Sequence, residues 1–233
     1  MSTNKTLLAV ALSAGLFSAG MAHATIISSN TGLAAYDHLV NFSNPSLANS
    51  TVVTNQYSAL GLTFSATAGG AVRANGCGVG YFDGTGFGFL GDTLSTLGPG
   101  CNPNSVNNNA FSLMFANDIS AASMSLYSYR GFGGIPSFST YLNGALVETF
   151  LHDAAADADL RFLSSNYGTG VLTFTGVFDE IRYQEGNAEN YLVFDNVAWV
   201  DHATVPEPAS LALMGLGLLG LAGVRRKKQN RGA

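Results

Sequence analysis

Between residues 25 and 205 the chain alternates short apolar runs with breaks that are rich in glycine and asparagine. The runs are rich in Val, Phe, Tyr, Thr and Ser, a composition typical of half-buried strands. Strands are predicted at 110–117, 123–130, 138–142, 145–151, 170–176, 178–184 and 191–200. Strands at this spacing, separated by turn residues, predict an all-β fold, a single antiparallel β-sandwich.

One turn can be predicted in detail. Asn143-Gly144 separates two of the predicted strands, and this dipeptide is the most favourable one for a two-residue hairpin. The following stretch, 152–160, has no strand pattern and is predicted to be a loop or a helical turn.

The first 24 residues have the parts of an export signal. Lys5 precedes an uncharged apolar run at 7–20, which ends in Ala22-His23-Ala24, a small-x-small cleavage site. We predict a signal peptide at 1–24 with cleavage after Ala24; a buried N-terminal helix is the alternative.

The last 29 residues have a different pattern. Pro206 and Pro208 resist helix, and the sixteen uncharged residues that follow, 209–224, predict a transmembrane helix of roughly 24 Å, against a hydrocarbon core of about 30 Å. A basic cluster ends the run and is expected to stay cytoplasmic: Arg225, Arg226, Lys227 and Lys228.

Together these features resemble the PEP-CTERM sorting signal. The motif residues are Val205, Pro206, Glu207 and Pro208, followed by the apolar run and the basic cluster. The resemblance implies processing by an exosortase, a membrane-embedded cysteine protease or transpeptidase, with cleavage near Pro-Glu-Pro. It also implies a membrane-anchored precursor and then a place at the cell surface or in an extracellular, biofilm-type matrix. An ordinary uncleaved anchor is the alternative.

The domain organisation follows from these ends: a signal peptide at 1–24, a β-sandwich domain at 25–204 and a sorting signal at 205–233. The stretches 53–65 and 178–200 resemble globular domains found ahead of this sorting signal. That resemblance implies a jelly-roll or galactose-binding-like β-sandwich and carries no enzymatic function with it.

The charge of the exported segment bears on its partners, and its cysteines bear on its covalent structure. Residues 25–205 hold four arginines, no lysine, and fourteen Asp and Glu, a net charge of −10, which disfavours binding to nucleic acid. Cys77 and Cys101 are the only cysteines, and in an exported chain they predict one disulfide. Closing a loop of about 25 residues would contribute roughly 3.5 kcal/mol.

Catalytic motifs are absent from the exported segment: it has no nucleophile elbow, zinc-protease helix or phosphate loop. Its histidines are His38, His152 and His202, and none stands in a nucleophile motif. We therefore predict a non-enzymatic protein. Two distant carboxylates could still form a glycosidase site, so a secreted hydrolase is the third alternative.

Two pairs of residues with oxygen-bearing side chains are candidates for a calcium site, since Ca²⁺ binds carboxylate and amide oxygens. They are Asp179 with Glu180 and Asp195 with Asn196; Asp153, Asp157 and Asp159 form a second cluster. Turn chemistry and solvated charge are the alternative roles for these residues.

Aromatic residues are candidates for sugar binding, because the faces of sugar rings are apolar. They are Trp199, the only tryptophan, and the group Tyr81, Phe82, Phe87 and Phe89. Core packing is the alternative and is favoured. The sequence thus predicts a structural or adhesive protein of the surface or matrix, with a carbohydrate-binding module, calcium-assisted or not, as its rival.

Overall fold

The computed structural model describes residues 25–29, 31–66, 71–75, 92–96, 110–129, 135–152, 161–164, 167–186 and 191–203. The strands are β1 (Thr25–Ser29), β2 (His38–Val40), β3 (Leu62–Ala66), β4 (Arg73–Asn75), β5 (Thr93–Ser95), β6 (Ala110–Tyr129), β7 (Ser137–Leu142), β8 (Ala145–Leu151), β9 (Arg161–Ser164), β10 (Tyr167–Gln184) and β11 (Tyr191–Asp201). A short 3₁₀ helix, η1 (Ser58–Leu60), precedes β3.

Two long strands, β6 and β10, organise the fold. The first half of β6 pairs with β3 on one side and with the second half of β10 on the other. That half of β10 also pairs with β7, and β7 pairs with β8; we call this sheet the first layer. The second half of β6 pairs with β11 and with the first half of β10, in what we call the second layer. All of these pairings are antiparallel, so the predicted all-β antiparallel fold is confirmed.

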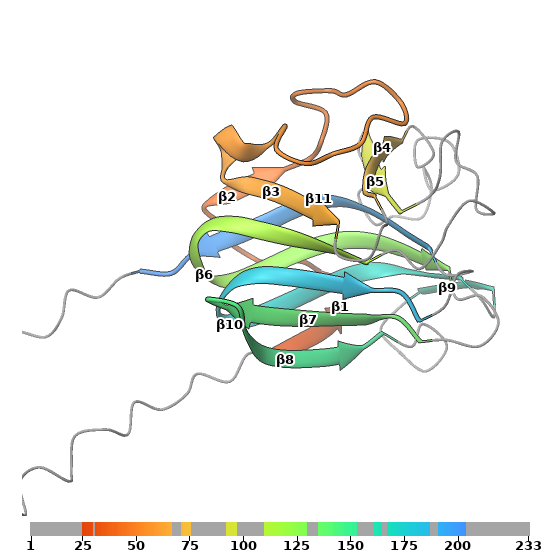
Figure 1. Ribbon diagram of the computed structural model, residues 1–233. Coiled ribbons are helices and arrows are strands. Elements are labelled where there is room, and N and C mark those ends of the chain that lie inside the picture. Colours follow the sequence, from red (N-terminus) through yellow and green to blue (C-terminus); the bar gives the residue numbers. More distant parts are fainter. Residues whose placement is uncertain are drawn as a thin grey trace, which may run out of the picture. The chain divides into compact units, whose positions relative to one another are not determined.

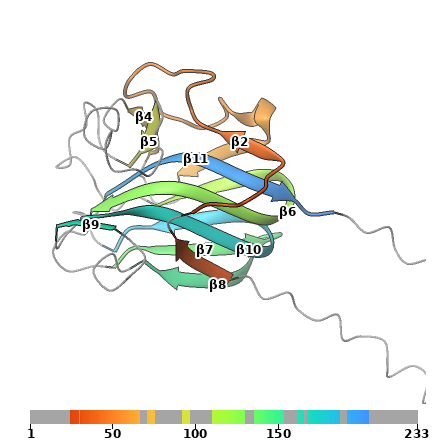
Figure 2. The same cartoon turned by 180° about the vertical axis from the view of Figure 1, so that it is seen from behind.

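The short strands extend the second layer at both edges. On one side β2 and β5 pair with β11, and β4 pairs with β5; on the other side β1 and β9 pair with β10. Figure 1 shows β6 curving from one layer into the other. The opposite view in Figure 2 shows β1 beside β10 and β2 beside β11.

The crossing from one layer to the other has a local cause in β10. The pairing of β10 with β6 changes register between Thr175 and Phe178 and again before Glu180. Gly176 lies at this place with a φ of 111°, a conformation that favours glycine. Bulges of this kind bend a strand and increase its twist, so one continuous strand serves both layers.

Aromatic side chains fill the space between the layers. Phe138 of β7 contacts Phe174 of β10 at a ring-centroid distance of 6.0 Å, and Phe115 of β6 contacts Trp199 of β11 at 5.4 Å. The first residue of each pair lies in the first layer and the second in the second layer. Each fully buried aromatic side chain contributes about 1.5–3 kcal/mol relative to an exposed one. The core therefore lies between two facing sheets.

The hairpin between β7 and β8 is confirmed. Asn143 has a φ of 51° and Gly144 a φ of 78°, and two successive positive values are what a type I′ turn requires.

The division of the long strands was predicted wrongly. The expected strands 110–117 and 123–130 are one strand, β6, and 170–176 and 178–184 are one strand, β10. In β6 the polar residues Asp118 and Ser120 lie where the strand crosses between layers, and in β10 Gly176 lies there, so the hydrophobic pattern breaks although each strand continues.

Several predicted features lie outside the described residues. They are the signal peptide, the disulfide between Cys77 and Cys101, the group Asp153, Asp157 and Asp159, and the tail from 204 to 233. Within the ranges given above, no helix reaches the length and hydrophobicity that a bilayer crossing requires.

Candidate functional site

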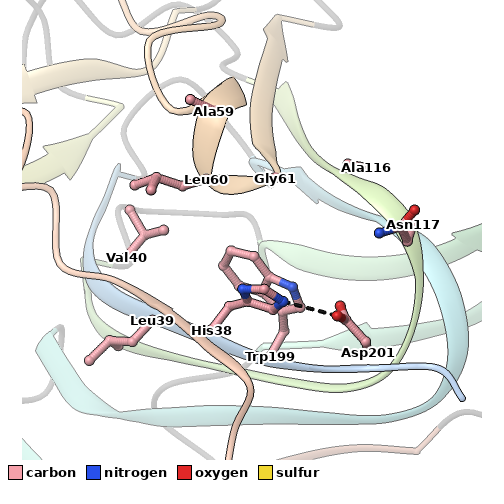
Figure 3. Close-up of a pocket in the computed structure, with 10 residues that line it drawn as sticks. All are labelled: His38, Leu39, Val40, Ala59, Leu60, Gly61, Ala116, Asn117, Trp199 and Asp201. Atoms are coloured by element: carbon pink, nitrogen blue, oxygen red, sulfur yellow. Dashed lines mark hydrogen bonds and ion pairs between the residues drawn. The ribbon is translucent and has the colours of Figure 1, made fainter.

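A pocket of about 310 Å³ opens where β2, η1, β6 and β11 meet (Figure 3). The residues that line it are His38, Leu39, Val40, Ala59, Leu60, Gly61, Ala116, Asn117, Trp199 and Asp201.

One wall of the pocket is built on the pairing of β2 with β11. His38 and Trp199 are direct partners in this antiparallel ladder, and their rings stack at a centroid distance of 4.8 Å and an angle of 21°. Asp201 lies two residues beyond Trp199, on the same face of the strand. Its Oδ2 lies 2.9 Å from Nε2 of His38. The pocket thus contains a histidine ring held between an indole and a carboxylate.

The pair formed by His38 and Asp201 is accessible to solvent. Their side chains are 44% and 43% exposed. When the imidazole is protonated, an exposed ion pair of this kind contributes about 0–1 kcal/mol to stability. Because both side chains are exposed, they remain available to a ligand.

The opposite side of the pocket is formed by the turn after η1. Gly61 has a φ of 88°, and its carbonyl accepts a hydrogen bond of 2.9 Å from the backbone N–H of Ala116. A Cβ at this position would lie 3.5 Å from Cζ2 of Trp199. Glycine therefore satisfies the backbone conformation, whereas a Cβ would make only an ordinary van der Waals contact with the indole.

The lining is divided into an apolar and a polar side. Leu39 and Leu60 are 45% and 43% exposed, although both are large and apolar. In Figure 3 they lie on one side of the pocket, and Asn117 and Asp201 lie on the other. Such a pocket suits a small ligand with one apolar and one polar face.

The polar groups of the lining are the side chains of His38, Asn117 and Asp201. Among the described residues that line the pocket there is no Ser, Thr, Cys, Lys or Tyr, so no hydroxyl, thiol or amine side chain lies beside the His38–Asp201 pair.

Asp179 and Glu180, one of the predicted calcium pairs, lie on β10 in the first layer. Asp179 Oδ2 accepts a hydrogen bond of 2.9 Å from the backbone N–H of Asn143, in the hairpin turn. Glu180 Oε1 accepts from Arg182 Nε at 3.1 Å and Nη2 at 2.9 Å, and also from Ser112. These carboxylates support a turn and an ion pair.

Asp195 and Asn196, the other predicted pair, lie on β11 in the second layer. Asp195 is fully buried, and its Oδ1 accepts a hydrogen bond of 2.7 Å from the backbone N–H of Asn196. The two predicted pairs therefore belong to different layers. In the part of the chain that the structure describes, no three His, Cys, Asp or Glu side chains gather in a way that could hold a metal ion. The calcium site stays a prediction.

A buried tyrosine lies near Asp195. The hydroxyl of Tyr57 donates to the carbonyl oxygens of Phe42 and Pro45, each at 3.1 Å. Burial raises the pKa of Tyr57 to about 12, and the negative charges of Asp92 and Asp195 act in the same direction.

Trp199 is a core residue and not an exposed platform, because it is only 3% exposed and His38 covers its ring. The other aromatic candidates, Tyr81, Phe82, Phe87 and Phe89, lie outside the described residues.

Sequence reasoning missed the pairing of His38 with Asp201, which are 163 positions apart. The only sequence signal was that Trp199 and Asp201, two residues apart on a predicted strand, face the same side. This signal does not identify the strand that pairs with them.

Comparison with known proteins gives one specific result. Residues 204–227 match the PEP-CTERM protein-sorting motif, which confirms the prediction made from the tail. The chain therefore carries the sorting motif of exported proteins that an exosortase processes. No curated protein matches the chain.

Two solved structures show distant similarity. The enzymatically active domain of tailspike protein 4 of bacteriophage CBA120 aligns with a TM-score of 0.35 and 11% identity, over 69% of this chain and 21% of that one. A point mutant of CBM29-2, a family 29 carbohydrate-binding module, aligns with a TM-score of 0.27 and 16% identity, over 80% and 98% of the two chains. This chain spans about a fifth of the tailspike chain. Neither similarity bears on the function proposed below.

Proposed function

Because the chain carries a PEP-CTERM motif, we propose that it is an exported, exosortase-processed, non-enzymatic protein of the cell surface or extracellular matrix. The observation that carries the proposal is the motif match at 204–227, directly after the last strand of the sandwich. The exported domain of this protein is a β-sandwich of the jelly-roll or galactose-binding-like kind.

The test is replacement of Pro206, Glu207 and Pro208 by alanine. The apolar run 209–224 and the basic cluster stay intact, so membrane insertion and orientation are retained. A sorting substrate should accumulate as a larger, membrane-bound precursor and disappear from the cell surface and medium. If the variant and the native protein have the same mass and the same membrane fraction, the tail is a permanent anchor and the proposal fails.

A second candidate function is carbohydrate binding, and the divided lining of the pocket favours it. Sugars combine an apolar ring face with hydroxyl groups that both donate and accept hydrogen bonds. A glycan array probed with the mature protein tests this function. Repeating the array with a chelator tests calcium assistance through residues such as Asp195, since binding that survives chelation does not depend on the ion.

A further inference from the structure

We infer that the pocket beside Trp199 binds an uncharged sugar residue, with Asn117 and Asp201 as its hydrogen-bonding partners and Leu60 against its apolar face. The inference rests on carbohydrate binding as the second candidate function and adds the site and the charge of the ligand. The pocket has a volume of about 310 Å³, at the lower end of the range for small-molecule pockets, about 300–1,000 Å³.

The charge of the pocket excludes acidic ligands. No Lys or Arg is among the described residues that line it, and His38 is already paired with Asp201. The surrounding segment, 25–205, has a net charge of −10. A uronic acid or a phosphate would therefore meet the carboxylate of Asp201 and a negative field, without a cation to bind it.

The polar side of the pocket matches hydroxyl groups. The side-chain amide of Asn117 offers both donors and an acceptor, and a carboxylate only accepts. Asp201 uses Oδ2 toward His38, which leaves Oδ1 for a ligand hydroxyl. Neighbouring hydroxyls on a sugar ring donate to one such group and accept from the other.

The apolar side of the pocket explains two exposed leucines. Leu39 and Leu60 are both more than two-fifths exposed, and both line the same pocket. Exposed apolar residues that gather at a pocket commonly mark a binding surface. The imidazole of His38 lies over Trp199, so a bound ring would meet the imidazole first (Figure 3).

The experiment uses the mature protein recovered after processing. Neutral oligosaccharides and oligosaccharides of uronic acid are titrated separately, with calorimetry for total binding. The fluorescence of Trp199, the only tryptophan in the chain, reports on the pocket. We expect a saturable fluorescence change with at least one neutral sugar and none with the uronic acids.

Variants then locate the site. N117A and L60A should each weaken neutral-sugar binding at least tenfold, while L146A, which removes a leucine that is 58% exposed on β8, should not change it. D201N keeps the shape of the side chain and removes its charge, so it should increase the affinity for uronic acid relative to the neutral sugar.

Each contrary result has a distinct meaning. Calorimetric binding with silent fluorescence and with N117A and L60A equal to the native protein would keep carbohydrate binding and overturn this site. Equal affinity for neutral and acidic sugars would overturn the charge exclusion. Absence of binding to every sugar tested would overturn the candidate function and the site together.

Discussion

Phe111 stacks on Phe194 at a ring-centroid distance of 5.4 Å with an angle of 9° between the rings, although the two residues lie in different layers. Phe194 also contacts Phe42 at 5.8 Å and Phe64 at 6.2 Å, and it is fully buried. This ring therefore joins both sheets to the loop after β2.

The variant F194A should lose about 3–5 kcal/mol of unfolding free energy, because truncation removes buried surface and leaves a cavity. Denaturant unfolding of the purified mature protein measures it. F150A is the control: Phe150 is only partly buried against the core, so its loss should be smaller. If F194A does not fold, F194L keeps most of the volume and should still be less stable than the native protein. Equal losses for F194A and F150A would contradict the role of Phe194.

Alkaline pH should destabilise the protein through Tyr57. Its folded pKa of about 12 exceeds the ordinary value of 10.0, so its contribution is fully present below pH 10 and is lost as the pH rises through 12. The expected loss at pH 11 is about 1.4 kcal/mol from this group. Tyr183, whose pKa burial also raises, adds loss in the same direction.

The variant Y57F isolates this effect. It should be less stable than the native protein at neutral pH, because the hydrogen bonds to Phe42 and Pro45 are lost. The difference should shrink between pH 9 and pH 11, since phenylalanine does not ionise. Parallel stability curves over this range would show that Tyr57 does not govern the alkaline loss.

Local chemistry made part of the fold predictable, and tertiary pairing made the rest unpredictable. Asn143-Gly144 defined a hairpin because the turn depends on the conformations of these two residues alone. The exchange of β6 between layers was not predictable, because the polar break near Asp118 is also typical of a loop. The pocket needed the pairing of β2 with β11, and three residues such as 38–40 carry too short a pattern to assign a partner.

The hairpin prediction can be tested by G144A. A Cβ at Gly144 would meet nothing within 4 Å, so its cost is the positive φ of 78° alone. That conformation costs an L-residue about 1–2 kcal/mol. N143G is the matched control, because glycine accepts the φ of 51° at that position without strain. Thermal unfolding should show a clear loss for G144A and little change for N143G; equal effects would contradict the I′ assignment.

The disulfide remains a prediction from the sequence. Because Cys77 and Cys101 are the only thiols, alkylation of the mature protein without reductant should add no mass. After reduction, two alkyl groups should be added, and the unfolding free energy should fall by roughly 3.5 kcal/mol. Labelling of both thiols before reduction would show that the pair does not form.

Cleavage near Pro206 should leave the sandwich intact, because the last backbone contacts of β11 lie before it. Asp201 donates its backbone N–H to Asp37 at 3.0 Å, and His202 donates to the carbonyl of Asp118 at 2.9 Å. A chain that ends at Thr204 keeps both bonds, so its Tm should equal that of a chain that ends at Pro208. A chain that ends at Val200 loses both, together with the pair between Asp201 and His38. At about 0.5–1.5 kcal/mol for each bond, and about 2–4 °C for each kcal/mol in a domain of this size, its Tm should fall by several degrees.

Equal Tm values for the chains ending at Thr204 and Val200 would mean that the end of β11 adds nothing to stability. A lower Tm at Thr204 than at Pro208 would mean instead that the sorting motif itself stabilises the fold and that processing removes this contribution.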